Sequence, residues 1–438
     1  ERHGAYTTAM NGQPWLQSAD WALTDPRLAA VAAQPMRLSH TADLARRIEL
    51  RPPGVLVLRG PRQVGKSTFL RELALRCLDE GVAGKDLLLV DAERLADRHA
   101  LLGELESFLG SRKGFSVVLI DEVNSIEKWW LAVKLLVDDG TASNALVVAT
   151  GSSTMDLAAG ADLMPGRRGR RHPVDLELLP APFAMVRPRL SLDDYLLTGG
   201  LPWSINEYLR TGTIPAHVYQ LHASWIEGAF LRHRHGTASL PHLLGRIAAH
   251  VGTPLSAQKL TRDAGLGSNH TTEAYLEILE RIFALLTARW IEPSGGPPAP
   301  RKNRKLYPSD PLLFHLFADF GKGWDSAFLS SKARLADDEA AGPAVEALVA
   351  AELRRRGHGR SLGYWLGRRE IDFVAPEIVE VKFRRHVSAA EFEWAVPLLP
   401  KGGSLTVLTR SDTARKGRVR LVPLERWLCE KPGQAPSP

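Results

Sequence analysis

One run of residues has the types and spacing needed to hold a chain of phosphates. It reads Gly60, Pro61, Arg62, Gln63, Val64, Gly65, Lys66 and Ser67, and Thr68 follows. Glycines let successive backbone N–H groups curl around phosphate oxygens, a lysine bridges those oxygens, and a serine hydroxyl reaches Mg²⁺. This is the spacing of a P-loop. It predicts that residues 60–68 bind ATP with Mg²⁺.

Two acidic residues, Asp121 and Glu122, directly follow the apolar run 117–120. An acidic pair at the carboxyl end of a buried parallel strand lies where ligands of open α/β sheets collect. Asp121 is predicted to hold Mg²⁺ through water, and Glu122 to polarise the water that attacks the terminal phosphate. The alternative is a turn at the end of a strand with two solvated acids.

Polar residues further along could complete this site. Ser152, within Thr150-Gly151-Ser152-Ser153, could sense the terminal phosphate through a hydrogen bond or cap the helix that follows. Arg167 belongs to the arginine-rich run 167–171. Oligomeric ATPases place an arginine from a neighbouring subunit at the terminal phosphate, and we predict that role for Arg167. A solvated loop and a DNA contact are the alternatives. The prediction implies a homo-oligomer, with a hexameric ring as one form.

A second group of reactive side chains lies near the C-terminus. Asp372 precedes Glu380-Val381-Lys382, and the alternation of a strand places Glu380 and Lys382 on one face. Such carboxylates can bind Mg²⁺ while the lysine activates water against a phosphodiester, and Glu346 could be a further metal ligand. A fold that binds DNA without cutting it and a surface ion pair between Glu380 and Lys382 are the alternatives.

Two sets of elements must position these groups. Strand candidates at 55–58, 86–91, 116–120, 146–150 and 174–179 alternate with helices, which predicts an α/β domain with a parallel sheet covered on both faces. The second group falls in a helix at 342–356, strands at 362–366, 370–375 and 378–382, a helix at 389–399 and a strand at 404–409. This order, with its Glu-x-Lys signature, resembles the restriction-endonuclease-like fold.

The segment between the α/β domain and the nuclease-like region has the pattern of a winged helix-turn-helix. Helices are expected at 240–251, 256–263 and 268–282, and strands at 286–291 and 305–307. The third helix would present Asn269, His270, Thr271 and Thr272 to DNA, and the wing would place Arg301, Lys302, Arg304 and Lys305 beside phosphates. A module that binds a protein partner is the alternative.

Charge is unevenly distributed along the chain. The formal net charge of the 438 residues is +7, and residues 351–438 contain 17 Lys and Arg against 10 Asp and Glu. The basic C-terminal region is therefore a candidate DNA-binding face, although a solvated positive surface is the alternative. We expect a cytoplasmic protein, because no apolar run is long enough to cross a membrane and no leader sequence is apparent. Cys77 and Cys429 support neither a disulfide framework nor a cysteine metal site.

The motifs, taken in order, resemble the archaeal and bacterial AAA-type ATPases that carry a C-terminal domain of unknown function. The resemblance rests on Gly60–Ser67, Leu119–Val123, Trp129, Lys134, Thr150–Ser153, Gly166-Arg167, Pro180–Phe183, Tyr195 and Gly199–Pro202. It implies an AAA+ core with a small helical lid. The expected domains are a lead-in without chemistry (1–40), the AAA+ core (41–189), the lid (190–235), the winged helix (236–310), connecting helices (311–341) and the nuclease-like domain (342–430).

Taken together, these patterns predict a protein that hydrolyses ATP and acts on DNA, as a motor or remodeller in repair or recombination. Whether it also has metal-dependent nuclease activity is left open by the sequence. The alternative is a nucleotide-controlled switch or scaffold whose C-terminal domain binds a protein partner and does not cut.

Overall fold

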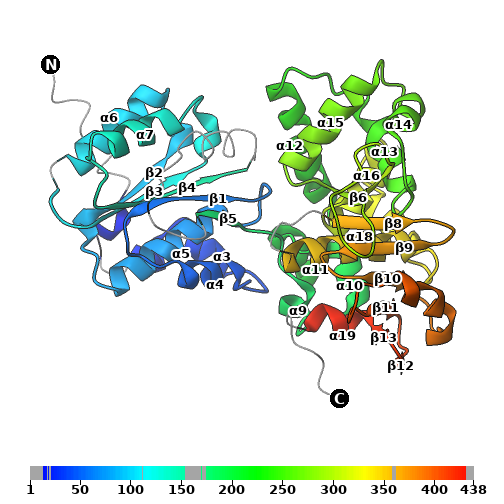
Figure 1. Ribbon diagram of the computed structural model, residues 1–438. Coiled ribbons are helices and arrows are strands. Elements are labelled where there is room, and N and C mark those ends of the chain that lie inside the picture. Colours follow the sequence, from blue (N-terminus) through cyan, green and yellow to red (C-terminus); the bar gives the residue numbers. More distant parts are fainter. Residues whose placement is uncertain are drawn as a thin grey trace. The chain divides into compact units, whose positions relative to one another are not determined.

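The computed structural model of the protein describes residues 13–16, 18, 21–110, 112–152, 169, 174–357 and 362–430. Arg167 therefore lies outside the described residues, as does Ser153. The chain divides into two compact units, Glu1–Leu179 and Pro180–Pro438 (Figure 1).

A parallel five-stranded sheet forms the centre of the first unit, and its strand order is β2-β3-β4-β1-β5. The strands are β1 (Gly54–Arg59), β2 (Leu87–Asp91), β3 (Ser116–Asp121), β4 (Ala145–Gly151) and β5 (Asp175–Glu177). The predicted α/β domain with a parallel sheet is confirmed. Because β4 lies between β1 and β3, the carboxyl ends of these three strands meet at one edge of the sheet, where ligands of this architecture bind.

Helices cover both faces of this sheet (Figure 1). One face packs against α6 (Arg98–Leu109) and α7 (Trp130–Asp138), and the other against α3 (Pro26–Ala32), α4 (His40–Arg47) and α5 (Lys66–Asp79). The central residues of β1 to β4 are apolar because alternate residues enter different cores: Val118 packs on the first side and Val117 on the second. The remaining short helices are η1 (Pro14–Leu16), α2 (Trp21–Thr24), η2 (Gly84–Asp86), η3 (Ala92–Arg94) and η4 (Val123–Ser125).

Much of the segment predicted as a lead-in is part of this core. Trp15, Trp21 and Leu28 are buried in the same apolar cluster as β1 and α5. The indole Nε1 of Trp15 donates to the carbonyl of Gly84 at 3.1 Å. The sequence predicted a lead-in without chemistry, and the structure adds that these residues contribute to the core. The helices of this segment span only three to seven residues, too few for a helical period to appear in the sequence.

An eight-stranded mixed sheet forms the centre of the second unit, in the order β12-β13-β11-β10-β9-β8-β6-β7. The strands are β6 (Leu285–Trp290), β7 (Arg304–Pro308), β8 (Leu362–Leu366), β9 (Glu370–Ala375), β10 (Val379–Lys382), β11 (Leu405–Thr409), β12 (Ala414–Lys416) and β13 (Val419–Pro423). The predicted strands at 286–291 and 362–366 pair directly, since Ala288 is in register with Leu362. The predicted winged helix and nuclease-like domain thus share one sheet and are not separate bodies.

The helices predicted at 240–251, 256–263, 268–282 and 342–356 form within two residues of those bounds, whereas the last helix of this unit was not predicted. The helices of this unit are α9 (Phe183–Val186), α10 (Leu192–Thr198), α11 (Pro202–Thr211), α12 (Ala216–Arg232), α13 (Leu240–Ala249), α14 (Ala257–Asp263), α15 (Asn269–Arg281), α16 (Pro311–Asp319), α17 (Ala327–Ala333), α18 (Gly342–Arg356) and α19 (Leu424–Cys429). The expected α-helix at 389–399 is instead a 3₁₀ segment, η5 (Ala389–Leu398), which contains Pro397, a residue that cannot donate a backbone hydrogen bond. None of the helices described combines the length and the apolar character required to traverse a bilayer.

Several motif residues of the second unit build a buried junction and not a reactive site. Tyr195 donates its hydroxyl to the carbonyl of Ala181 at 2.7 Å. The carboxylate of Asp310 accepts the backbone N–H groups of Gly200 at 2.8 Å and Leu312 at 2.9 Å. Burial raises the pKa of Asp310 to about 6, although both N–H groups act in the opposite direction. The Gly199-Gly200 pair therefore serves to let α10 approach the start of α16.

Candidate functional site

The P-loop joins the end of β1 to the start of α5, as the sequence predicts. Gly65 has a φ of +108°, and a Cβ atom there would lie 2.9 Å from Thr41 Cγ2. A Cβ atom at Gly60 would collide with the carbonyl of Leu178. Both positions therefore require glycine. No described side chain caps the start of α5, so the N–H groups of its first turn remain available to an anion.

Lys66 is the buried cation of this loop. Its Nζ donates to the carbonyls of Gly60 at 3.0 Å and Pro61 at 2.8 Å. Burial lowers the pKa of Lys66 to about 8, while the negative charges of Glu122 and Asp121 oppose that shift. Phosphate oxygens would supply the negative charge that this buried ammonium lacks in its neutral carbonyl partners.

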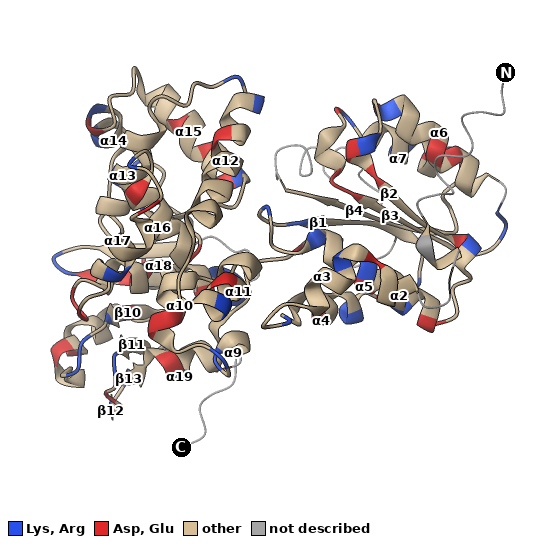
Figure 2. Cartoon of the chain, turned by 180° about the vertical axis from the view of Figure 1, so that it is seen from behind, with Lys and Arg blue, Asp and Glu red and all other residues tan. Residues whose placement is uncertain are grey.

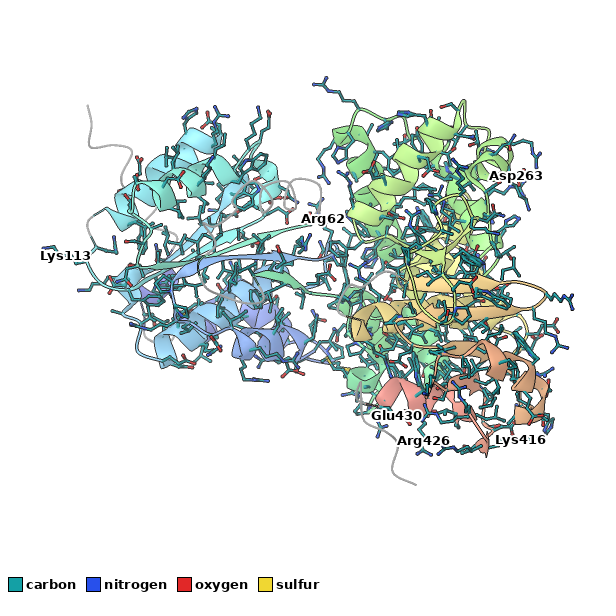
Figure 3. The ribbon with its side chains drawn as sticks, viewed as in Figure 1. Arg62, Lys113, Asp263, Lys416, Arg426 and Glu430 are labelled. Atoms are coloured by element: carbon teal, nitrogen blue, oxygen red, sulfur yellow. The ribbon has the colours of Figure 1, made fainter. Side chains whose placement is uncertain are left out.

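The other predicted loop residues differ in exposure. Arg62, labelled in Figure 3, and Gln63 are exposed, Val64 is buried, and Ser67 and Thr68 are half-buried at the start of α5. Exposed positions within the loop leave room on that side for a ligand. The half-buried hydroxyl of Ser67 directly follows Lys66, which suits it to hold a metal ion beside bound phosphates.

The acidic pair lies at the carboxyl end of β3, and its hydroxyl partners lie at the carboxyl end of the neighbouring β4. Thr150 donates its hydroxyl to Asp121 Oδ1 at 2.8 Å and accepts the backbone N–H of Glu122 at 3.3 Å. The hydroxyl of Ser152 donates to Glu122 Oε1 at 2.5 Å, so in this structure Ser152 orients the glutamate, a role that neither sequence alternative included. Glu122 has a φ of +48°, an uncommon conformation for a residue with a side chain and one that is frequent at functional sites.

These residues fit a nucleotide with Mg²⁺. The loop offers uncapped N–H groups and a desolvated ammonium to phosphates, and the hydroxyl of Ser67 with the carboxylate of Asp121 offers hard oxygen donors to the metal ion. Asp121, Glu122 and Ser152 are brought together at the sheet edge that carries the loop, as predicted from the sequence.

Three residues near this site were missed from the sequence. Arg27 Nη1 lies 3.4 Å from Asp121 Oδ2, although 94 residues separate the two in the chain. His40 Nε2 lies within hydrogen-bonding distance, 2.9 Å, of the carbonyl of Val64, and Thr41 contacts the Gly65 position. No motif marks these residues, because their roles depend on how α3 and α4 pack against α5.

The second predicted site is also assembled, with an unexpected member. Asp372 Oδ2 accepts the backbone N–H of Val381 at 2.9 Å, Glu380 Oε2 accepts that of Asp372 at 3.2 Å, and Lys382 Nζ lies 2.7 Å from Glu380 Oε1. Lys305, which the sequence placed on an exposed wing, is fully buried among these carboxylates. Its side chain extends from β7 to Glu346 on α18 and Asp372 on β9. The prediction of a phosphate contact by Lys305 was therefore wrong.

Lys305 bonds to three carboxylates at once. Its Nζ lies 3.1 Å from Asp372 Oδ1 and 3.2 Å from Glu346 Oε1, and it also contacts Glu370. The hydroxyl of Tyr307 donates to Glu346 Oε1 at 2.7 Å. We call Glu346, Glu370, Asp372 and Glu380, with Lys305 and Lys382, the carboxylate cluster. Within the described ranges, no three His, Cys, Asp or Glu side chains are arranged to hold a metal ion.

Burial and mutual repulsion set the charges in this cluster. Burial, and then Asp372, raise the pKa of Glu346 to about 7 and that of Glu380 to about 8. Burial alone would also raise the pKa of Asp372, but Lys305, Lys382 and the N–H of Val381 hold it below its usual value. The protein's own lysines therefore keep the central aspartate ionised. As arranged, the cluster does not fit a metal ion, because an ammonium lies where the carboxylates converge.

The residues predicted to meet DNA also differ in exposure. Thr272 is buried and pairs with the hydroxyl of Thr261 at 2.7 Å, whereas Asn269 and His270 are exposed and Thr271 is half-buried. Arg304 forms a two-pronged ion pair with Glu273. Of the four basic wing residues, only Arg301 and Lys302 are exposed. The predictions for Thr272, Arg304 and Lys305 as free DNA contacts are corrected accordingly.

Basic residues of the C-terminal region are extensively paired with acids. Figure 2 shows blue and red segments interspersed over the second unit. Ion pairs join Arg410 to Asp193, Lys416 to Glu393, Arg426 to Glu430 and Arg384 to Glu391. The basic excess in the sequence therefore does not translate directly into an unopposed positive face.

Comparisons with known proteins identify two segments. Residues 52–186 match the family model described as AAA domain, and residues 189–322 match that of a domain of unknown function, DUF8612. The second match covers the predicted lid and winged helix and does not reach the nuclease-like region. No protein of curated function matches the sequence.

Solved structures are similar only at a distance. The Walker-type ATPase Paby2304 of Pyrococcus abyssi is 18% identical with a TM-score of 0.42, over 64% of this chain and 95% of that chain. The Orc1 protein of Aeropyrum pernix, solved in complex with DNA, is 15% identical with a TM-score of 0.31, over 73% and 97% of the two chains. The RuvB Holliday junction branch migration motor of Thermotoga maritima is 14% identical with a TM-score of 0.29, over 63% and 91%. These scores are too low to transfer a function.

The family match spans the P-loop, the acidic pair and the strands that position them. Together with the geometry of Lys66, Asp121 and Glu122, it identifies residues 52–186 as an AAA-type P-loop ATPase domain.

Proposed function

We propose that the protein hydrolyses ATP at the P-loop of its first unit and uses the cycle to act on DNA through its second unit. One observation supports the hydrolytic part most directly. Glu122 is held by Ser152 at the sheet edge that also carries Asp121 and the P-loop, so a carboxylate is fixed where a water can be activated.

The proposed reaction divides the work among few residues. The N–H groups of the loop and the ammonium of Lys66 would bind and orient the phosphates, which suits a reaction that depends chiefly on positioning and charge. Ser67 and Asp121 would hold Mg²⁺, which neutralises phosphate charge when bound. Glu122 would orient the attacking water and take up its proton.

Completion of the site by a neighbouring subunit is part of the proposal. We expect Arg167→Ala to reduce the ATPase rate by about 1,000-fold or more, because an arginine at the terminal phosphate is worth 10³–10⁵ in rate. If the arginine acts across a subunit boundary, mixing Arg167→Ala with Lys66→Ala subunits should restore activity, since mixed interfaces contain one intact site. No restoration, together with a specific activity independent of protein concentration, would contradict a trans role and the homo-oligomer, whether a hexameric ring or smaller.

DNA is the proposed substrate because α13, α14 and α15 with the β6–β7 hairpin match the elements predicted for a winged helix-turn-helix, and exposed Asn269 and His270 lie in the first turn of α15. Arg301 and Lys302, in the β6–β7 loop, remain exposed for phosphate contacts, and Lys302 Nζ lies 5.3 Å from the ring centre of Trp290. The proposed contact region is therefore smaller than the sequence suggested.

We expect duplex or single-stranded DNA to stimulate ATP hydrolysis, and DNA affinity to fall with salt. Replacing Arg301 and Lys302 with Gln should lower the slope of log affinity against log salt by about 2, since each phosphate contact contributes about 0.9 for duplex DNA. Lys416→Gln, in a distant strand and paired with Glu393, is the matched control and should leave the slope unchanged. ATPase rates with and without single-stranded, duplex and branched DNA test the proposal as a whole.

Two other functions remain as candidates. Metal-dependent DNA cleavage was predicted from Asp372, Glu380 and Lys382, but the ammonium of Lys305 among the carboxylates opposes it. Incubation of the protein with linear and branched DNA in Mg²⁺ or Mn²⁺ shows whether it cleaves DNA. The other candidate is a nucleotide-controlled switch that binds a protein partner. A DNA-independent ATPase without salt-sensitive DNA binding would favour it.

A further inference from the structure

Lys305 occupies the point where the acidic side chains of the second unit converge. It projects from β7, outside the segment in which the sequence placed the nuclease-like residues, and its side chain has 0% exposure. Glu346 comes from α18, and Glu370 and Asp372 from β9. Three elements distant in sequence thus bring one ammonium and three carboxylates together.

The bonding of this ammonium is complete. A lysine ammonium has three N–H donors and no acceptor, and Lys305 has three carboxylate partners. Tyr307 donates its hydroxyl to Glu346 and so adds to the bonding of the carboxylates. A buried charge is stable only when it is paired and hydrogen-bonded in this way. The ammonium of Lys305 therefore already occupies the position that a bound cation would take in this cluster.

The turn between α13 and α14 covers the Glu346 side of the cluster. A Cβ atom at Gly252, in the turn between α13 and α14, would collide with the carboxylate of Glu346. This turn therefore packs directly on the cluster, which leaves Glu346 only 16% exposed. Glu370 is 30% exposed, but a metal ion could not bind Glu346 and Asp372 together with it unless it displaced the ammonium of Lys305.

A divalent ion and Lys305 would compete for the same oxygens. Mg²⁺ and Mn²⁺ bind hard carboxylate oxygens at about 2.0–2.2 Å and require several of them or waters in a regular arrangement. Two cations bound to the same oxygens would repel each other strongly in a region of low dielectric constant. The lysine is covalently part of the chain, so its local concentration favours it over an ion from solution.

We infer that Lys305 is the resident cation of the carboxylate cluster, taking the place of a divalent metal ion, and that its removal creates a metal site from Glu346, Glu370 and Asp372. This inference rests on the cluster alone and is independent of the ATPase. It assigns the cluster, in the intact protein, to holding β7, β9 and α18 together without metal-assisted chemistry.

Mn²⁺ binding to the full-length protein, measured by electron paramagnetic resonance without nucleotide, tests the inference. The wild-type protein should show no Mn²⁺ site that depends on Asp372. Lys305→Met, which removes the ammonium at nearly constant volume, should gain one such site, and Mn²⁺ should then raise its unfolding temperature. Adding Asp372→Asn to Lys305→Met should remove the new site. Subtracting the signal of the double variant from that of Lys305→Met also removes the contribution of Mn²⁺ bound at the P-loop.

Arg304→Met is the matched control, because it removes a positive charge from the same strand but from a pair with Glu273 outside the cluster. It should gain no Mn²⁺ site. Asp372-dependent Mn²⁺ binding by the wild-type protein would overturn the inference even if Lys305→Met failed to fold. So would a folded Lys305→Met, with ATP hydrolysis intact, that binds no Mn²⁺. Lys305→Ala, which leaves more room for metal-bound water, provides a second variant.

Discussion

Replacing Glu122 with Gln is expected to lower the ATPase rate by about 100-fold or more while leaving ATP affinity nearly unchanged. The amide preserves the shape of the side chain and can still accept a hydrogen bond from Ser152, whose hydroxyl lies 2.5 Å from Glu122 Oε1. It cannot take a proton from water. Phosphate release and equilibrium binding of a fluorescent ATP analogue measure the two properties separately.

Lys66→Ala and Glu127→Gln complete this experiment. Lys66→Ala should lose nucleotide affinity, because it removes the buried ammonium of the P-loop that would pair with phosphate oxygens. Glu127 lies five residues beyond Glu122, its side chain is 88% exposed, and its Gln variant should behave as wild type. Unchanged turnover in Glu122→Gln would show that another group activates the water.

Replacing Gly199 with Ala should destabilise the second unit by about 3 kcal/mol or more. Gly199 has a φ of +62° and a ψ of −162°, a conformation essentially restricted to glycine. A Cβ atom there would also collide with the buried carboxylate of Asp310, which holds the N–H groups of Gly200 and Leu312. Relieving the collision would break these bonds, and buried unpaired groups cost about 1–3 kcal/mol each.

Gly212→Ala is the control for a positive φ without a collision, because Gly212 lies in the left-handed region at φ +70° and ψ 8°. No atom lies within 4 Å of its added Cβ. It should therefore cost only about 1–2 kcal/mol for the left-handed backbone. Hydrogen exchange under native conditions can follow α10 and α16 apart from the P-loop unit. Equal losses of protection in the two variants would show that the contact with Asp310 carries no energetic weight.

The nucleotide site could be predicted from the sequence because its chemistry is local. Residues 60–67 carry the glycines, the lysine and the serine in one turn, and Asp121 marks the end of an apolar strand. Hydrophobic patterns likewise located the six predicted strands of the second unit, β6 to β11, to within one residue, but β12 and β13 were not predicted. Arg27 could not be found, since its contact with Asp121 depends on how α3 packs.

Lys305 shows a different limit of sequence reasoning. Arg301, Lys302, Arg304 and Lys305 appear as one basic patch in the sequence. In β7 the alternation of a strand sends Arg304 toward Glu273 and Lys305 toward Asp372, on the other face. The residues next to Arg304 and Lys305 in the sequence do not indicate which of these two side chains is buried. The acids that decide it, Glu346 and Asp372, lie 41 and 67 positions further along the chain.

The pairing of β6 with β8 bears on how the chain can be divided for expression. The DUF8612 match ends at residue 322, yet β6 has β7 on one side and β8, at 362–366, on the other. A fragment of residues 189–322 would leave one side of β6 without its neighbour, and a fragment beginning at 342 would do the same to β8. Bare strand edges recruit strands from other molecules. Fragments cut between these strands should therefore aggregate, whereas a fragment beginning at Pro180 keeps the eight-stranded sheet whole.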